Sequence, residues 1–162
     1  MKKLFIILFV TTIVFSGCKK YKEGPLISFR SVSTRLIGVW QVTEYISNGV
    51  DSLQYYNDSC GANLYISNFE DYNNRFNMFF DQYSKKDFHS IIILSDNRKE
   101  LYVSSFIDDF GKYFNGPFSP NTESNWNILK LTNKELKVTV DINNKNYRMS
   151  LKKISDLNGK PI

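Results

Sequence analysis

Apolar and polar side chains alternate through the C-terminal part of the chain, and this pattern constrains the fold more than any other feature of the sequence. Residues 136–142 and 147–152 place Leu, Val, Ile, Tyr or Met at every second position, with polar or charged residues between them. A period of two is typical of a β-strand with one buried and one solvent-exposed face. Together with residues 126–131 and the polar turns at 132–134 and 143–146, the pattern predicts a three-stranded antiparallel meander.

Weaker alternation earlier in the chain predicts five further strands, over residues 36–46, 64–69, 75–80, 88–94 and 101–107. Asn48-Gly49 predicts a type I′ hairpin turn, because both central residues of that turn need positive φ, and a second strand should begin near Val50. A short helical turn over 33–37, capped by Ser33 or Thr34, should precede the first strand.

About eight antiparallel strands in a single domain predict an all-β fold. Closing the sheet into a barrel removes its exposed edges, so we expect an eight-stranded antiparallel meander barrel; a two-sheet β-sandwich is the alternative that the pattern leaves open. The sequence has no long helical period, heptad or internal repeat. Its longest predicted loop is 108–124, which contains two Gly and two Pro.

The N-terminus has the order of charged, apolar and small residues that is typical of a secretory signal peptide. Lys2 and Lys3 precede an apolar run over 4–15, which is too short for a membrane-spanning helix of about 20 residues. Ser16-Gly17-Cys18 resembles the lipobox of bacterial lipoproteins, and this resemblance implies that Cys18 becomes the acylated first residue of the mature protein. A buried N-terminal helix with an incidental cysteine is the alternative.

Cleavage before Cys18 would divide the chain into a signal peptide (1–17), an acylated N-terminus and tether (18–33), one barrel domain (34–154) and a tail (155–162). Removing the first 17 of 162 residues leaves 145, the size of one ordinary domain. The cut removes two of the 21 basic side chains, and the remaining 19 against 16 acidic ones are too dispersed to predict nucleic-acid binding.

We expect the protein to be anchored by its lipid in the outer membrane or elsewhere in the cell envelope. The residues after Cys18 lack the acidic run that resembles surface-export signals, and this favours the periplasmic side.

Gly38-Val39-Trp40 resembles the Gly-X-Trp signature on the first strand of lipocalins. The wider resemblance is to small lipocalin-like lipoproteins of Bacteroidetes, and it covers residues 36–42, 48–49, 126–132, 135–136 and 147–153. It implies that Gly38 and Trp40 form the base of the barrel, and that a basic residue, Arg148 or Lys152, packs over the Trp40 ring. It also implies a small hydrophobic ligand inside the barrel.

Five residues are candidates for lining a ligand cavity or its mouth: Glu44, Tyr55, Tyr56, Tyr113 and Phe114. Glu44 falls on the apolar face of the first strand, so it either lies at an exposed strand end or points into a cavity. The aromatic residues fall in predicted loops, which would form a binding mouth if they met at one end of the barrel.

The interior volume distinguishes two functions. A cavity of about 300 Å³ or more would indicate a ligand carrier. A filled barrel would indicate the alternative, an accessory lipoprotein that binds a cell-envelope protein or glycan through its loops.

No motif for catalysis, for a metal or for an organic cofactor occurs in the sequence, so we expect a non-enzymatic protein without a cofactor. His89 is the single histidine, and one histidine excludes a cluster of histidine ligands.

Cys60 has no partner for a disulfide if Cys18 carries lipid. We interpret it as a partly buried residue of a loop over 58–61, with a reactive thiol as the alternative. Asp51-Ser52-Leu53 resembles the motif at which Bacteroidetes attach O-glycans, and this resemblance implies a glycan on Ser52.

Overall fold

The computed structural model of the chain describes residues 20–24, 30–69, 74–81, 88–107, 117–118 and 122–161. The predictions for Cys18, Tyr113 and Phe114, and for the signal peptide, lie outside these residues. The side chain of His89 lies outside them as well.

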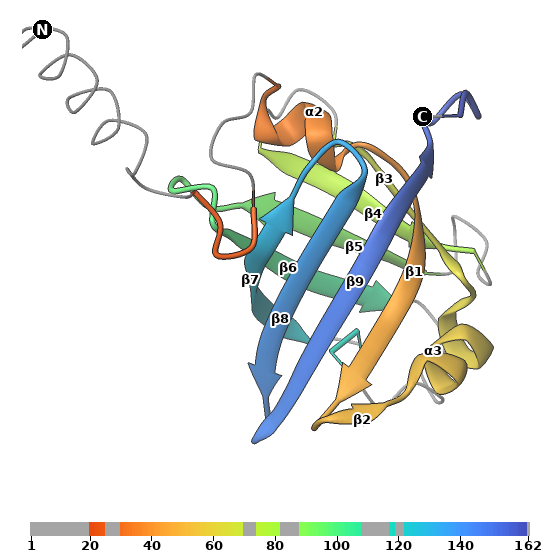
Figure 1. The fold of residues 1–162 in the computed structure, drawn as a ribbon, viewed down its shortest axis with the longest axis vertical. Coiled ribbons are helices and arrows are strands. Elements are labelled where there is room, and N and C mark those ends of the chain that lie inside the picture. Colours follow the sequence, from red (N-terminus) through yellow and green to blue (C-terminus); the bar gives the residue numbers. More distant parts are fainter. Residues whose placement is uncertain are drawn as a thin grey trace, which may run out of the picture.

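Eight strands form a closed antiparallel barrel (Figure 1). They are β1 (Gly38–Ser47), β3 (Asn63–Asn68), β4 (Arg75–Phe80), β5 (Phe88–Leu94), β6 (Glu100–Ile107), β7 (Glu123–Leu131), β8 (Glu135–Ile142) and β9 (Lys145–Ser155). Each strand pairs with its neighbour along the chain, and β1 also pairs with β9, which closes the sheet. The predicted meander barrel is therefore confirmed, and the β-sandwich alternative is wrong.

A ninth strand, β2 (Val50–Asp51), pairs only with the end of β1. The two are joined by the predicted Asn48-Gly49 turn, whose residues have φ of 53° and 80°. Positive φ at both positions is what a type I′ turn requires.

Two short helices lie at opposite ends of the barrel, α2 (Val32–Leu36) beside the start of β1 and α3 (Leu53–Cys60) beside its end (Figure 1). Helix α2 confirms the predicted helical turn, but its N-cap is Ser31, whose hydroxyl accepts a bond from the Thr34 N–H at 3.1 Å. Within the described part of the chain, neither helix has the length and apolar character to cross a bilayer.

Helix α3 was not predicted. The sequence pattern suggested a strand near Val50 followed by loops, but Leu53, Tyr56 and Cys60 recur at helical spacing and turn one face toward the barrel. The Asp51 carboxylate accepts a bond from the first N–H of the helix, and Gly61 ends it with a φ of 81°. A segment of eight residues is too short for a helical period to be distinguished from the composition of a loop.

The alternating side chains of the C-terminal meander do form one buried face. Those that point into the barrel are Leu136, Val138, Val140, Tyr147, Met149 and Leu151. The adjacent strand β7 begins at Glu123, three residues before its predicted start, and this shortens the loop predicted over 108–124.

The N-terminal segment 20–24, which falls within the predicted tether over 18–33, packs on the barrel. Tyr21 is buried in the main hydrophobic core, and its hydroxyl donates to the Arg98 carbonyl oxygen at 3.0 Å. The Glu23 N–H donates to the Leu129 carbonyl at 2.7 Å, next to an irregularity in the β7–β8 pairing. The pattern missed this because polar neighbours masked a single buried aromatic residue.

Candidate functional site

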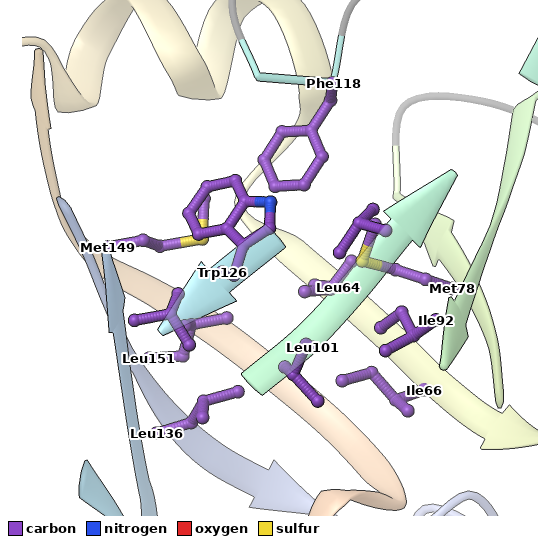
Figure 2. Close-up of a pocket in the computed structure, with 12 residues that line it drawn as sticks. Leu64, Ile66, Met78, Ile92, Leu101, Phe118, Trp126, Leu136, Met149 and Leu151 are labelled. Atoms are coloured by element: carbon purple, nitrogen blue, oxygen red, sulfur yellow. The ribbon is translucent and has the colours of Figure 1, made fainter. Parts of the chain in front are cut away.

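The barrel interior is the first candidate site, and it is narrow. A cavity of about 30 Å³ lies along the barrel axis, close to the volume of one water molecule. Figure 2 shows apolar side chains converging on it from around the barrel, with Phe118 and Trp126 stacked at one end. Its twelve lining residues are Leu64, Ile66, Met78, Ile92, Leu101, Val103, Phe118, Trp126, Leu136, Val138, Met149 and Leu151.

A chain of aromatic rings closes the barrel on the side of α3. Consecutive ring centroids lie 5.1–6.4 Å apart, the range of favourable stacked and edge-to-face contacts. Phe118 belongs to a turn between β6 and β7 and stacks on Trp126 with an interplanar angle of 15°. We call this set the aromatic layer: Tyr147, Tyr45, Tyr56, Phe80, Phe118 and Trp126.

Three serine hydroxyls add polarity to the interior near the aromatic layer. Ser90 and Ser105 face each other across β5 and β6, and their hydroxyl oxygens lie 3.0 Å apart. The Ser124 hydroxyl accepts a bond from the Trp126 indole N–H at 2.9 Å. All three residues are buried, so each of these bonds satisfies a group that would be costly to leave unpaired.

The opposite end of the barrel is closed by Trp40, which is fully buried. Its indole N–H donates to the Leu36 carbonyl of α2 at 2.8 Å. The Lys153 ammonium lies 4.6 Å from the centre of the Trp40 ring and donates to the Arg35 and Ile37 carbonyls at 2.5 and 2.6 Å. These carbonyls belong to the last turn of α2, so Lys153 joins the helix end, the tryptophan and β9.

The basic residue over the tryptophan is therefore Lys153, and the prediction of Arg148 or Lys152 is wrong. Arg148 and Lys152 point outward, whereas Lys153 continues the inward set of β9. Burial and the charge of Arg30 lower the pKa of the Lys153 ammonium to about 8. Extending the period of two by one step beyond Leu151 would have found it.

Gly38 is required for this arrangement. Its φ is 143°, a conformation that side chains disfavour. A Cβ there would lie 2.9 Å from the Ser155 carbonyl oxygen and 3.2 Å from two carbons of the Lys153 side chain. The spacing Gly-X-Trp thus leaves room for the lysine over the ring.

Glu44 does not line the interior cavity. It lies on the outer face of β1, where its carboxylate accepts a bond from the Ser150 hydroxyl at 2.6 Å and lies 3.8 Å from the Arg148 guanidinium. An irregularity in the β1–β9 pairing between Val42 and Glu44 shifts the side chain out of the inward set. A bulge of this kind cannot be read from alternation alone.

The two tyrosines of α3 separate. Tyr56 is fully buried in the aromatic layer, and its burial raises the pKa of its hydroxyl well above the usual value. Tyr55 is 46 % exposed. The helix therefore places one tyrosine in the core and the other on the surface, instead of bringing both to a loop mouth.

Cys60 is buried at the end of α3, and its burial raises the thiol pKa to about 12. A thiol that stays protonated at neutral pH is a poor nucleophile. Its environment therefore favours the interpretation of a structural residue. Ser52 precedes α3 and is partly exposed.

A second candidate site is a groove of about 400 Å³ on the outer face of β1, β8 and β9. Its walls carry three lysines and two hydroxyls, and its one carboxylate, Glu135, forms an ion pair with Lys130 at 2.5 Å. We call it the basic groove; it is lined by Thr43, Lys134, Glu135, Lys137, Ser150, Leu151 and Lys152. Among the residues that the structure describes, no group of three or more His, Cys, Asp or Glu side chains gathers as a metal site would.

Comparison with known proteins gives no relative. No family model, no curated protein and no solved structure matches the chain. The chemistry of the interior and of the basic groove therefore carries the functional argument.

Phe118 is a buried residue that the sequence pattern did not indicate. It lies between two prolines in a segment of loop composition, and no alternation marks it as buried. Only its hydrophobicity within a polar stretch could have indicated burial.

Proposed function

We propose that the protein is a non-enzymatic lipoprotein, anchored in the cell envelope through an acylated Cys18, whose barrel is a rigid scaffold for binding an envelope partner on its outer surface. The observation that carries this proposal is the interior volume. Ligand pockets of proteins measure about 300–1,000 Å³, whereas the described cavity measures about 30 Å³. Among the residues that the structure describes, so small an interior cavity favours the accessory function over the carrier function.

The basic groove is the best candidate for the contact surface. Lys134 and Lys152 offer ammonium groups around an open volume of about 400 Å³, and Lys137, which also lines it, is paired with Glu23 at 3.2 Å. Ammonium groups suit carboxylate-bearing or phosphate-bearing sugars of the envelope. This surface differs from the loop contact expected from the sequence.

Binding to an acidic glycan tests the proposal. Acylated protein in detergent would be titrated with acidic and neutral envelope oligosaccharides, and the double variant Lys134→Gln/Lys152→Gln should lose most of the affinity for the acidic ones. Lys145→Gln/Lys160→Gln removes two exposed lysines outside the groove and is the matched control. Equal binding by both double variants would contradict the groove as the contact surface.

A ligand carrier is the second candidate, and the three buried serines favour it. An apolar pocket with a few polar groups is the usual form of a small-molecule site, and Ser90, Ser105 and Ser124 supply hydroxyls in an otherwise apolar interior. Native mass spectrometry of protein purified without detergent distinguishes the two functions. A co-purifying small molecule would support the carrier, and its absence would support the scaffold.

A further inference from the structure

Cations gather where the N-terminal segment joins the barrel. The Lys20 ammonium and the Arg35 guanidinium lie 5.9 and 6.0 Å from the centre of the Tyr21 ring, and the Tyr21 hydroxyl bonds the Arg98 carbonyl. Figure 1 shows segment 20–24 beside the turn between β5 and β6, which contains Arg98. Two exposed lysines are adjacent in sequence to these residues: Lys22 follows Tyr21, and Lys99 follows Arg98.

The ion pairs of the described residues leave Lys20 and Arg98 of this cluster without a carboxylate partner. Glu23 is engaged elsewhere, with Lys137 at 3.2 Å and Arg148 at 3.5 Å, and the nearest other carboxylates in sequence are the exposed Asp96 and the partly exposed Glu100, which follows Lys99. Burial and the charges of Arg98 and Arg35 lower the pKa of Lys20, as expected for an ammonium that lacks a counter-ion.

The position of Tyr21 limits how far this cluster can lie from a lipid on Cys18. Only three residue steps separate Cys18 from Tyr21, and a fully extended chain spans at most about 3.6 Å per residue, so the reach is about 10 Å. The headgroup layer on each side of a bilayer is about 5–8 Å thick. Because Tyr21 is fixed in the core, a lipid anchor would bring the barrel itself to the headgroups.

We propose that this part of the barrel rests on the membrane and binds the phosphates of anionic phospholipids. The proposal rests on the acylation of Cys18 that the proposed function includes. We call the contact the membrane-facing surface; its exposed or partly exposed cations are Lys20, Lys22, Arg98 and Lys99.

The rate at which each lysine reacts with an amine-reactive ester tests whether this surface lies against the membrane. Acylated protein would be inserted into vesicles of phosphatidylcholine alone or of phosphatidylcholine with phosphatidylglycerol, treated with a membrane-impermeant amine-reactive ester, and mapped by mass spectrometry. One basic residue at an anionic surface changes binding by about fivefold. We therefore expect Lys20, Lys22 and Lys99 to react about fivefold more slowly on the anionic vesicles, and Lys145 and Lys152 to react equally on both.

Two matched variants show whether the protection of the lysines depends on the charge of the cluster or only on its closeness to the membrane. Arg98→Gln should remove much of the protection at Lys20 and Lys99, whereas Lys145→Gln, in the turn between β8 and β9, should leave it unchanged. Thermal denaturation would show that both variants fold.

Equal reaction of the three lysines on both vesicles would overturn the proposal and leave the cluster to an acidic protein or glycan. Intact mass separates this outcome from a failure of the proposed function. A chain without acyl groups would contradict the anchor, whereas an acylated chain without protection would contradict only the membrane-facing surface.

Discussion

The two ends of the barrel are closed by different physical means. At the α2 end, directional bonds join Trp40, Lys153 and Arg35 to the carbonyls of Leu36, Ile37 and Leu131, among others. At the α3 end, the aromatic layer closes the barrel chiefly by ring packing. Directional bonds specify one geometry, whereas packed rings can shift with a smaller loss.

This difference locates where the barrel could open. Moving Trp40 would leave its indole N–H and the Leu36 carbonyl without partners, and each unpaired group would cost about 1–3 kcal/mol. Moving Phe118 chiefly costs apolar contacts with Phe80 and Trp126. If the interior ever admits a ligand, the entry should lie beside α3.

The largest expected effect comes from breaking the α2 end. Trp40→Ala should lower the free energy of unfolding by about 5 kcal/mol, at the upper end for a buried aromatic residue, because it also leaves the Leu36 carbonyl without its donor. Urea denaturation would measure the loss. Trp40→Phe is the control, because it keeps an aromatic ring, and it should lose less than half as much stability as Trp40→Ala. Equal losses from the two variants would show that ring packing contributes little at this position.

Truncation at the α3 end should cost less. Phe118→Ala should lower the free energy of unfolding by about 3 kcal/mol, because the turn that carries it can relax into the space. The same change should enlarge the cavity beneath Trp126 and increase the fluorescence of a bound hydrophobic dye. A dye response from Trp40→Ala but not from Phe118→Ala would reverse the comparison of the two ends.

Removing the ammonium at the α2 end should cost less stability than either of these two truncations. Lys153→Met keeps most of the side-chain volume but leaves the Arg35 and Ile37 carbonyls without a donor, and we expect a loss of about 2 kcal/mol. Lys152→Met, one position away on the outer face, is the matched control and should change stability by less than about 0.5 kcal/mol.

The contribution of Lys153 to the free energy of unfolding should also depend on pH. Its pKa is about 8 in the folded protein and 10.5 otherwise, so between these values the unfolded chain binds more protons. The contribution of Lys153 to stability should therefore rise with pH from about 8 to 10.5. Subtracting the curve of Lys153→Met from that of the wild type removes the opposing effect of Cys60, and a flat difference would contradict the lowered pKa.

The smallest effect should come from the outer face between the two ends. Glu44 and Arg148 have side chains 41 % and 38 % exposed, and pairs of this kind contribute about 0–1 kcal/mol. Glu44→Gln keeps the contact to Ser150 and should change the midpoint of urea denaturation very little. A loss above about 1 kcal/mol would show that Glu44 has a structural role that its exposure does not indicate.

The order of the strands, and the position of Gly38 and Trp40 at the α2 end, could be predicted from the sequence. Alternation over 136–142 and 147–152 predicted the meander because each inward residue recurs at the period of the β pleat. Gly38 and Trp40 were predicted to lie at the base of the barrel, and Trp40 does close that end.

The placement of Glu44 and Tyr56 could not be predicted from the sequence, because each depends on a feature without local periodicity. A bulge turned Glu44 outward, and a short helix buried Tyr56. Helix α3 has eight residues, and two turns are too few for a helical pattern to stand out from a loop.

The sequence by itself determined that the chain is a β-meander with an export signal pattern and a Gly-X-Trp base, because strand period, turn residues and signal composition are all local properties. Only the tertiary structure decided how full the barrel is and where its charges gather. Those depend on contacts such as Phe118 with Phe80 and Tyr21 with the Arg98 backbone, between residues 38 and 77 positions apart. Closure of the barrel creates these contacts, and no short stretch of the chain contains them.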